Sequence, residues 1–317
     1  MPAFNRAACI GAAIESVLAQ ELADFELVIV DDGSSDGTAE VAHSYKDARV
    51  TVIELPENRG SNAARNAGIR AASAPLIAFL DSDDVYLPHK LATVVSQFDS
   101  RPELDVLVDS FVKLCSPAAK RPRVERRNPR IDSTREFARR LFGRELWKPT
   151  SAITVRREAA LRAGLFDESV RRRQDLDFLI RLTELANCAS TDEILWVKSW
   201  SPDGISAGNQ FVASTLELVR RHPRYLSDPD YRCGLAKDLA QHMLRHLRAR
   251  RFARAGADAR SMVGELGAAR TGALLLTGAK ELANRARSKK VKRRRESAAE
   301  QPSSAPAKAR NRASARS

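Results

Sequence analysis

The feature that most constrains the fold of this chain is a repeated order of short apolar runs, each closed by an acidic turn. Residues 26–30 run into the segment 31–38 (Asp-Asp-Gly-Ser-Ser-Asp-Gly-Thr), and residues 76–80 run into the segment 81–84 (Asp-Ser-Asp-Asp). Apolar runs of this length, bounded by polar turns, are typical of buried parallel strands. Because helical stretches alternate with them, the sequence predicts an α/β domain with a mostly parallel sheet flanked by helices.

Both acidic segments follow the ends of predicted strands. In parallel sheets, ligands bind at the carboxyl ends of the strands. Asp81 and Asp83 are two residues apart, so on extended chain their side chains point the same way. Mg²⁺ is usually bound by one or two carboxylates together with substrate phosphates. The pattern is therefore compatible with a metal–diphosphate site, while a turn whose Asp side chains cap the next helix has the same composition.

Several other classes of site are not supported by the sequence. It contains no G-x-G-x-x-G after a strand, no G-x-x-x-x-G-K-[ST] and no H-E-x-x-H, which argues against dinucleotide, P-loop and zinc-protease sites. His242 and His246 share a helix face, but no third ligand is evident and they are interpreted as surface residues. A response-regulator receiver also carries acidic strand ends. It needs a Lys at a later strand end, for which only Lys113 is available, and it leaves the second half of the chain unexplained.

The second half of the chain begins with the polar segment 115–133, which is rich in Pro and Arg and predicts a mobile loop. Further helices are predicted at 133–142, 156–163 and 174–186, with extended segments at 151–155 and 194–200. The stretch 207–283 has a helical pattern with modest hydrophobicity.

The positive charge of the chain is concentrated at one end. Formal net charge is +13, and residues 284–317 contribute twelve Lys or Arg against two Glu. This segment has too few apolar residues to form a core, so it predicts a disordered basic tail. The tail is either a solvated end or an electrostatic anchor for anionic lipid. A nucleic-acid partner is the weakest alternative, because it gives the acidic segments no role.

The cysteines and the N-terminal segment bear on the cellular compartment. Four widely spaced cysteines without a C-x-x-C pair argue against a zinc ribbon or a disulfide framework and favour a reducing cytosol. The longest apolar runs are about five residues, far below the ~18 of a membrane span. Glu15 interrupts the apolar segment 7–14, so we expect an amphipathic helix capped by Asn5 instead of a signal peptide.

Six segments occur in an order and spacing that resemble a known family. They are residues 2–7 (Pro-Ala-Phe-Asn-Arg-Ala), 30–38, 58–68, 79–84, 164–168 (Gly-Leu-Phe-Asp-Glu) and 174–182 (Gln-Asp-Leu-Asp-Phe-Leu-Ile-Arg-Leu). The ordered set resembles the family 2 glycosyltransferases of the GT-A fold over residues 2–206. The resemblance implies a GT-A domain over 1–206, followed by a helical extension over 207–283 and the basic tail over 284–317.

The resemblance also implies a role for individual residues. Those implied to bind the nucleotide sugar are Pro2, Phe4, Asn5, Asp31, Asp32, Arg65 and Asp81. Asp83 is implied as the ligand of a divalent metal ion, Mg²⁺ or Mn²⁺. Asp175 is implied as the catalytic base, with Asp177 as the second candidate, although an acid at a helix N-terminus is also favoured by the helix dipole alone.

The implied reaction is transfer of a sugar from a nucleotide sugar, most simply a UDP-sugar, to an acceptor hydroxyl with inversion. A metal ion neutralises charge on the leaving diphosphate, and a carboxylate removes the acceptor proton. The acceptor is a saccharide or a lipid-linked saccharide in polysaccharide, lipopolysaccharide or other glycoconjugate synthesis. The implied location is cytoplasmic, with the basic tail at the inner face of the cell membrane as a further hypothesis. The alternative is a non-catalytic nucleotide-sugar-binding protein of the same fold.

The sequence departs from the family pattern in two places. Family members have an apolar strand just before the segment that here is 2–5, so we expect that strand to be missing upstream of Met1, which would leave neighbouring strand edges unpaired. Many members also place a His before a Gly-rich turn, where Ser201 stands here. Ser is a weaker metal ligand than His, so we expect weaker metal binding, or Asp203 as a substitute ligand.

Overall fold

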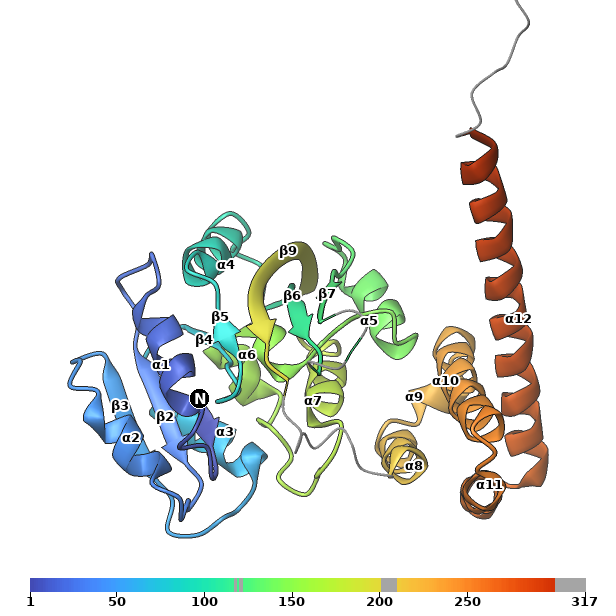
Figure 1. Ribbon diagram of the computed structural model, residues 1–317, viewed down its shortest axis with the longest axis horizontal. Coiled ribbons are helices and arrows are strands. Elements are labelled where there is room, and N and C mark those ends of the chain that lie inside the picture. The colour runs from blue at the N-terminus through green and yellow to red at the C-terminus, as the bar shows by residue number, and fades with distance from the viewer. Residues whose placement is uncertain (117–118, 120–121, 201–209, 300–317) are drawn as a thin grey trace, which may run out of the picture.

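The computed structural model describes residues 1–116, 119, 122–200 and 210–299. It consists of an α/β body that contains the N-terminus and a group of helices at the opposite end (Figure 1). The strands are β1 (Pro2–Ala3), β2 (Leu27–Asp31), β3 (Val50–Glu54), β4 (Leu76–Ala78), β5 (Val85–Tyr86), β6 (Val106–Leu114), β7 (Arg123–Arg126), β8 (Ile153–Arg156) and β9 (Cys188–Lys198).

The helices follow the order expected from the sequence over most of the chain. They are α1 (Ile10–Leu18), α2 (Thr38–Ser44), α3 (Ser61–Ala71), α4 (Lys90–Asp99), α5 (Thr134–Phe142), α6 (Arg157–Arg162), α7 (Gln174–Leu182), α8 (Phe211–Arg221), α9 (Arg224–Ser227), α10 (Pro229–Arg248), α11 (Phe252–Leu266) and α12 (Ala268–Ala299). A single 3₁₀ turn, Thr150–Ala152, precedes β8.

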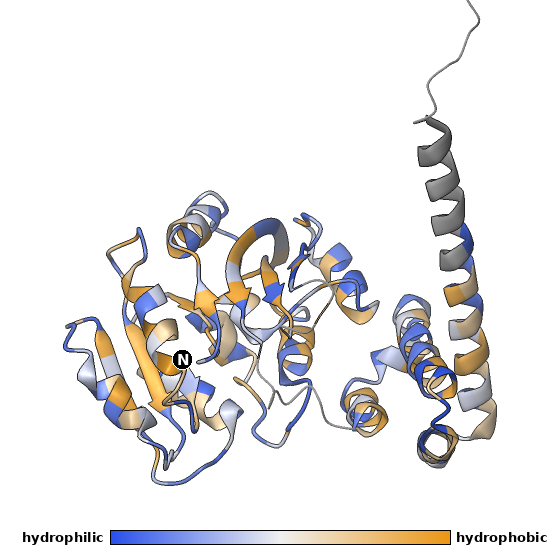
Figure 2. Ribbon diagram, viewed as in Figure 1, coloured by the Kyte–Doolittle hydropathy of each residue, from blue (hydrophilic) through white to orange (hydrophobic). Residues whose placement is uncertain are grey.

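The first sheet is parallel, as predicted, and has the order β1-β2-β3. Apolar residues along β2 are buried, with α3 and α2 packed against the strand, and α1 turns Ile10, Ile14 and Val17 inward at helical spacing. The hydrophobic colour of β2 is visible in Figure 2. Strand β1 contributes two residues, and the Met1 nitrogen continues its ladder by donating to the Val28 carbonyl at 2.7 Å. The acidic end of β2 thus lies beside the segment that follows β1.

The second sheet is mixed. Its order is β4-β8-β6-β9-β5, with β7 paired to β6. Only the β6–β9 pair is parallel, and the other pairs are antiparallel. The mostly parallel pattern predicted from the sequence therefore describes the first sheet, while in the second sheet β5, β7 and β8 run opposite to β4, β6 and β9. Strand β7 returns directly along β6, which requires only a short connection between antiparallel neighbours.

Three local predictions are corrected by the structure. Strand β7 lies within the segment 115–133 that was expected to be a mobile loop, because Arg123–Arg126 pairs with the end of β6. Helix α1 begins after Cys9, and Asn5 does not cap it: Asn5 adopts φ 51° and accepts a hydrogen bond from the Ser35 amide. Strand β9 begins at Cys188, before the predicted start, because its polar first residues pair with β6 in the interior.

The C-terminal helices α8 to α12 confirm the helical pattern of the sequence after residue 207. Helix α12 packs along α10 and continues to Ala299, so it extends sixteen residues into the segment expected to be a disordered tail. The reason is local, since residues 284–299 are mostly Ala, Arg, Lys and Glu without Gly or Pro. The remainder of that tail, 300–317, lies outside the described residues. Among the described helices, none combines the length and apolar character needed to cross a bilayer.

Candidate active site

The acidic segment after β4 is held by cations from two other elements. Arg65, buried on α3, donates from Nη2 to Asp81 Oδ1 at 2.8 Å. Burial acts to raise the pKa of the Asp81 carboxyl, but the charges of Arg65 and Lys198 outweigh it and hold that pKa below its usual value. Asp81 is therefore kept ionised, and α3 is fixed to the end of β4.

Asp84 anchors the other end of this segment in the interior. Its carboxylate accepts hydrogen bonds from Ser151 Oγ at 2.7 Å and from the Ser199 amide at 3.2 Å, and Lys198 Nζ lies 3.4 Å away. Burial raises the pKa of Asp84 to about 7, with Lys198 opposing the shift. Ser151 Oγ also accepts from the Asp81 amide at 3.0 Å. Asp84 therefore acts as a positioning group for the segment.

Asp83 lies between these two anchored acids and is half-buried. Within the part of the chain that the structure describes, no donor makes a hydrogen bond or ion pair with its carboxylate. Carboxylate oxygens that are partly shielded from water and not used by the protein are suited to bind a divalent cation. Ser201 and Asp203, the residues at and near the family His position, lie outside the described residues.

The carboxylates at the acidic end of β2 are held by backbone amides of the following turn and of the segment before α3. Asp31 accepts from the Ser34 amide at 2.9 Å, and Asp32 accepts from the amides of Arg59 and Gly60 at 2.9 and 2.8 Å. Gly33, which follows Asp32, has φ +70°, and a Cβ there would approach the Glu57 backbone carbon to 2.8 Å. The turn therefore requires glycine, and it presents two buried carboxylates in a fixed position.

The segment after β1 lies against this turn. Pro2 pairs with Val30 in the parallel ladder, and the Asn5 amide donates to Ser34 Oγ at 2.9 Å. Phe4 is 41% exposed, which leaves its ring available to a ligand. The structure thus brings Pro2, Phe4 and Asn5 together with the Asp31–Asp32 turn, as expected of residues that share one binding site.

Helix α3 connects the acidic strand ends to a segment about a hundred residues further along the chain. Asn66 donates to the Phe166 carbonyl and accepts from the Phe166 amide, both at 2.9 Å. Asn62 donates to the carbonyls of Asp167 and Val170 at 2.8 Å. The helix that carries Arg65 therefore also fixes the segment leading to α7.

Asp175 lies at the start of α7 among cations. Its Oδ1 accepts from the Leu176 amide at 2.8 Å, and Lys148 Nζ lies 4.0 Å from its Oδ2. Arg173 and Arg144 also act on it electrostatically, and burial together with repulsion from Arg144 lowers the pKa of Arg173 to about 10. The Asp175 side chain is 24% exposed, so its carboxylate is accessible from outside the protein.

Asp177, the second candidate base, has a different environment. It is buried, with Arg181 Nη2 2.9 Å from Oδ2 and His222 Nε2 2.8 Å from Oδ1. Both carboxylate oxygens are therefore occupied: Oδ2 pairs with Arg181 within α7, and Oδ1 joins α7 to His222 at the end of α8. This pairing identifies Asp177 as a structural acid and leaves Asp175 as the accessible one.

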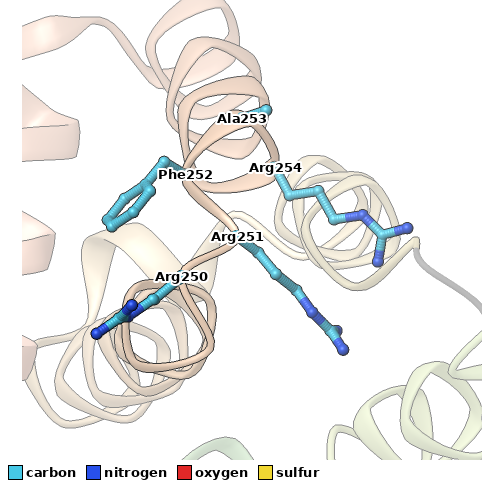
Figure 3. Close-up of a pocket in the computed structure, with 5 residues that line it drawn as sticks. All are labelled: Arg250, Arg251, Phe252, Ala253 and Arg254. Atoms are coloured by element: carbon cyan, nitrogen blue, oxygen red, sulfur yellow. The ribbon is translucent and has the colours of Figure 1, made fainter.

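Sequence reasoning missed the cations and the serine around these acids. These residues belong to no motif: Lys198 ends β9, Ser151 is in the 3₁₀ turn, Arg144 and Lys148 lie between α5 and that turn, and Arg173 precedes α7. Only Lys198 carried a signal, because it lies near the end of a predicted extended segment. Figure 3 shows a hollow lined by residues 250–254 at the turn between α10 and α11. It contains none of the predicted site residues, so it is separate from the acidic strand ends.

Comparison with known proteins identifies the family to which this chain belongs. Residues 1–169, more than half of the chain, match the family model described as Glycosyl transferase family 2. The chain belongs to glycosyltransferase family 2. This confirms the family recognised in the sequence, and the matched range contains the acidic segments after β2 and β4 together with the α3 residues that position them.

Relatives and solved structures agree with this family. The chain is 47% identical over 98 residues to the succinoglycan biosynthesis protein ExoO of Rhizobium meliloti (strain 1021), a match that covers 31% of this chain and 28% of that protein. The matches cover between 28% and 61% of the length of the first curated relatives.

Two solved structures share the fold. S. aureus TarS 1–349 in complex with UDP-GlcNAc has a TM-score of 0.58 and 18% identity, over 78% of this chain and 71% of that chain. The mannosyltransferase PcManGT from Pyrobaculum calidifontis in complex with GDP-Man and Mn²⁺ has a TM-score of 0.54 and 22% identity, over 88% and 78% of the two chains. The GT-A fold predicted from the sequence is confirmed.

Proposed function

We propose that this family 2 member transfers a sugar from a UDP-sugar to a hydroxyl of a saccharide or lipid-linked acceptor, with inversion at the anomeric carbon, in the synthesis of an envelope polysaccharide. The observation that carries the proposal is the arrangement after β4. Asp83 has no protein partner among the described residues, while Asp81 and Asp84 on either side of it are fixed by Arg65, Lys198 and Ser151.

The nucleotide is assigned to the residues gathered at the ends of β1 and β2. Pro2, Phe4, Asn5 and the Asp31–Asp32 turn lie together there, and the Arg65–Asp81 pair lies at the end of β4. The bound UDP-GlcNAc of TarS supports a uridine donor, and the GDP-Man of PcManGT makes GDP the competing nucleotide to test.

The carboxylate oxygens after β4 are suitable ligands for a divalent metal ion. Oxygen ligands of this kind suit Mg²⁺ and Mn²⁺, which complete their coordination with substrate phosphates and water. Asp83 would hold the ion, and the Mn²⁺ of PcManGT supports this assignment. When bound, the ion neutralises the negative charge that develops on the leaving diphosphate. The chain's part is to keep Asp83 unpaired and to hold Asp81 and Asp84 on either side of it.

Asp175 is the proposed general base. It accepts the proton of the acceptor hydroxyl while the acceptor oxygen forms a bond to the anomeric carbon and the bond from that carbon to the diphosphate oxygen breaks. Attack from the face opposite the diphosphate inverts the configuration in one step. The cations Arg144, Lys148 and Arg173 lie around this carboxylate, and Lys148 Nζ is 4.0 Å from its Oδ2.

The division of the chain follows the same proposal. Residues 1–206 bind and transfer the sugar, and the helices from 207 onward extend the acceptor side. The basic segment 284–317 attaches the protein to anionic lipid at the cytoplasmic face of the membrane, where lipid-linked acceptors would be met. Flotation with anionic and neutral liposomes tests the attachment, since equal recovery with both would contradict it.

The first experiment is calorimetric titration of UDP and of GDP, each with and without Mn²⁺. We expect UDP to bind in a Mn²⁺-dependent manner and the dependence to be lost in Asp83→Ala. The exposed Asp24 provides the matched control, and Asp24→Ala should bind as the wild type does. Unchanged binding by Asp83→Ala would refute the metal assignment. Binding of UDP without turnover of any UDP-sugar would favour the non-catalytic alternative.

A further inference from the structure

Three metal-ligating side chains meet in the C-terminal helices, away from the nucleotide site. His242 and His246 lie one turn apart on α10, and Asp258 comes from α11. His242 Nε2 lies 3.0 Å from Asp258 Oδ2, His246 Nε2 lies 3.5 Å from the same oxygen, and the two Nε2 atoms are 3.1 Å apart. Each residue thus directs one ligand atom to a common point.

These distances match the spacing of ligands around a tetrahedral ion. An ion bound at about 2.0–2.1 Å by each ligand holds neighbouring ligand atoms about 3.3 Å apart. The three observed separations, 3.0, 3.1 and 3.5 Å, lie on both sides of that value. Two nitrogens and one oxygen therefore mark one triangular face of a tetrahedron, with the fourth position open.

Hydrogen bonds between neutral groups account for this cluster poorly. A neutral imidazole nitrogen is either a donor or an acceptor. If His242 Nε2 donates to Asp258, it cannot also accept from His246 Nε2 at 3.1 Å. If it accepts from His246, its lone pair faces the carboxylate oxygen. A cation at the centre removes this conflict, because all three atoms then present lone pairs to it.

The surroundings keep the ligands in place. His246 is buried, and the His242 ring stacks on Phe211 of α8 with ring centroids 4.3 Å apart. Little reorganisation is needed for binding.

We propose that His242, His246 and Asp258 form a second metal site that takes a zinc-class divalent ion and joins α11 to α10. Two imidazoles and one carboxylate suit Zn²⁺, whereas Mg²⁺ prefers oxygen ligands alone. The site is structural. The site is linked to the residues around Asp175 through Phe211. The guanidinium carbons of Arg173 and Arg144 lie 4.6 and 5.4 Å from the centroid of the Phe211 ring.

The test uses the full chain and Co²⁺, which reports a tetrahedral nitrogen-containing site by its visible absorption. We expect one such site per chain in the wild type and in Asp83→Ala, so that this result does not depend on the donor-site proposal. Zn²⁺ should displace the Co²⁺ and raise the Tm.

Two variants and one control complete the design. His246→Gln and the more conservative Asp258→Asn should each weaken Zn²⁺ binding by at least about tenfold. His89→Gln removes an exposed imidazole elsewhere and should leave binding unchanged. Circular dichroism and UDP titration establish that each variant is folded. Absence of the Co²⁺ band in the wild type, or an undiminished band in folded Asp258→Asn, would overturn the proposal.

Discussion

The end of β4 and the start of α7 each present an aspartate to the candidate active site, in opposite electrostatic surroundings. Asp83 lies between two further acids, whereas Asp175 lies among Lys148, Arg144 and Arg173. Surplus negative charge favours a bound cation, whereas a single carboxylate among cations already has partners of opposite charge. The same residue type is thereby suited to metal binding in one region and to proton transfer in the other.

The buried interactions that hold the two regions in place also differ. Below β4, the buried Lys90 pairs with Asp109, whose other oxygen accepts from Trp196 Nε1 at 2.8 Å, and Lys90 Nζ lies 3.4 Å from the Ser151 carbonyl. Behind Asp175, Asp177 joins α7 to His222. One support is an ion pair within the sheet core, and the other joins the catalytic half to the C-terminal helices.

The largest effect is expected at Asp175. Asp175→Asn removes the proton acceptor and should lower turnover of the active UDP-sugar by about 10²–10⁴-fold. UDP affinity should remain within about twofold, because among the described residues the Asp175 carboxylate accepts its hydrogen bond from the Leu176 amide of its own helix. Kinetics and calorimetry on the same preparation separate the two quantities. Turnover equal to that of the wild type would remove Asp175 from the mechanism.

A smaller effect is expected beneath β4. Lys90→Met leaves the buried Asp109 without its cation and should lower the free energy of unfolding by about 3–5 kcal/mol. Burial already raises the pKa of Asp109 to about 6 in the presence of Lys90. Urea denaturation measures the loss.

The double variant Lys90→Met with Asp109→Asn is the control for this interpretation. It removes the uncompensated charge while an amide oxygen can still accept from Trp196. It should recover more than half of the stability lost in the single variant. A double variant as unstable as Lys90→Met would show that the loss comes from packing and not from the buried charge.

The smallest effect is expected at Asp177, and it depends on pH. Burial acts to raise the pKa of Asp177, but its hydrogen bond to His222 and the charge of Arg181 lower it overall. A depressed pKa stabilises the folded state above the unfolded value of about 3.9, and the contribution is lost as the pH falls through the folded value. Asp177→Asn should therefore cost about 1–3 kcal/mol at neutral pH.

Urea denaturation of wild type and Asp177→Asn over a pH series checks this prediction. The difference between them should persist down to about pH 4 and disappear only at lower pH, where the wild-type carboxyl is protonated too. Asp24→Asn, at an exposed position, should show no difference at any pH. A constant difference down to the lowest pH would indicate that shape and not charge makes Asp177 important.

The sequence predicted the features that depend on neighbouring residues. The β-branched run before Asp31 forms β2, and the Ala-rich segment after residue 60 forms α3. Two predictions from the sequence were wrong: a loop was expected where β7 forms, and a disordered tail was expected where α12 continues to Ala299. Strand β7 has little apolar character and forms only because β6 offers it an edge, whereas α12 continues because no helix breaker interrupts its basic end.

For the candidate site, the sequence alone determined which acids follow which strands and that the ordered motifs belong to one family. It could not assign their partners, because Lys198, Ser151 and Lys148 come from distant elements and follow no periodic pattern. Likewise, His242 and His246 could be placed on one helix face, but their third ligand comes from α11. Helical spacing is a local property that a sequence shows directly. Which charges and ligands meet is decided by the packing of distant elements, and only the tertiary structure shows it.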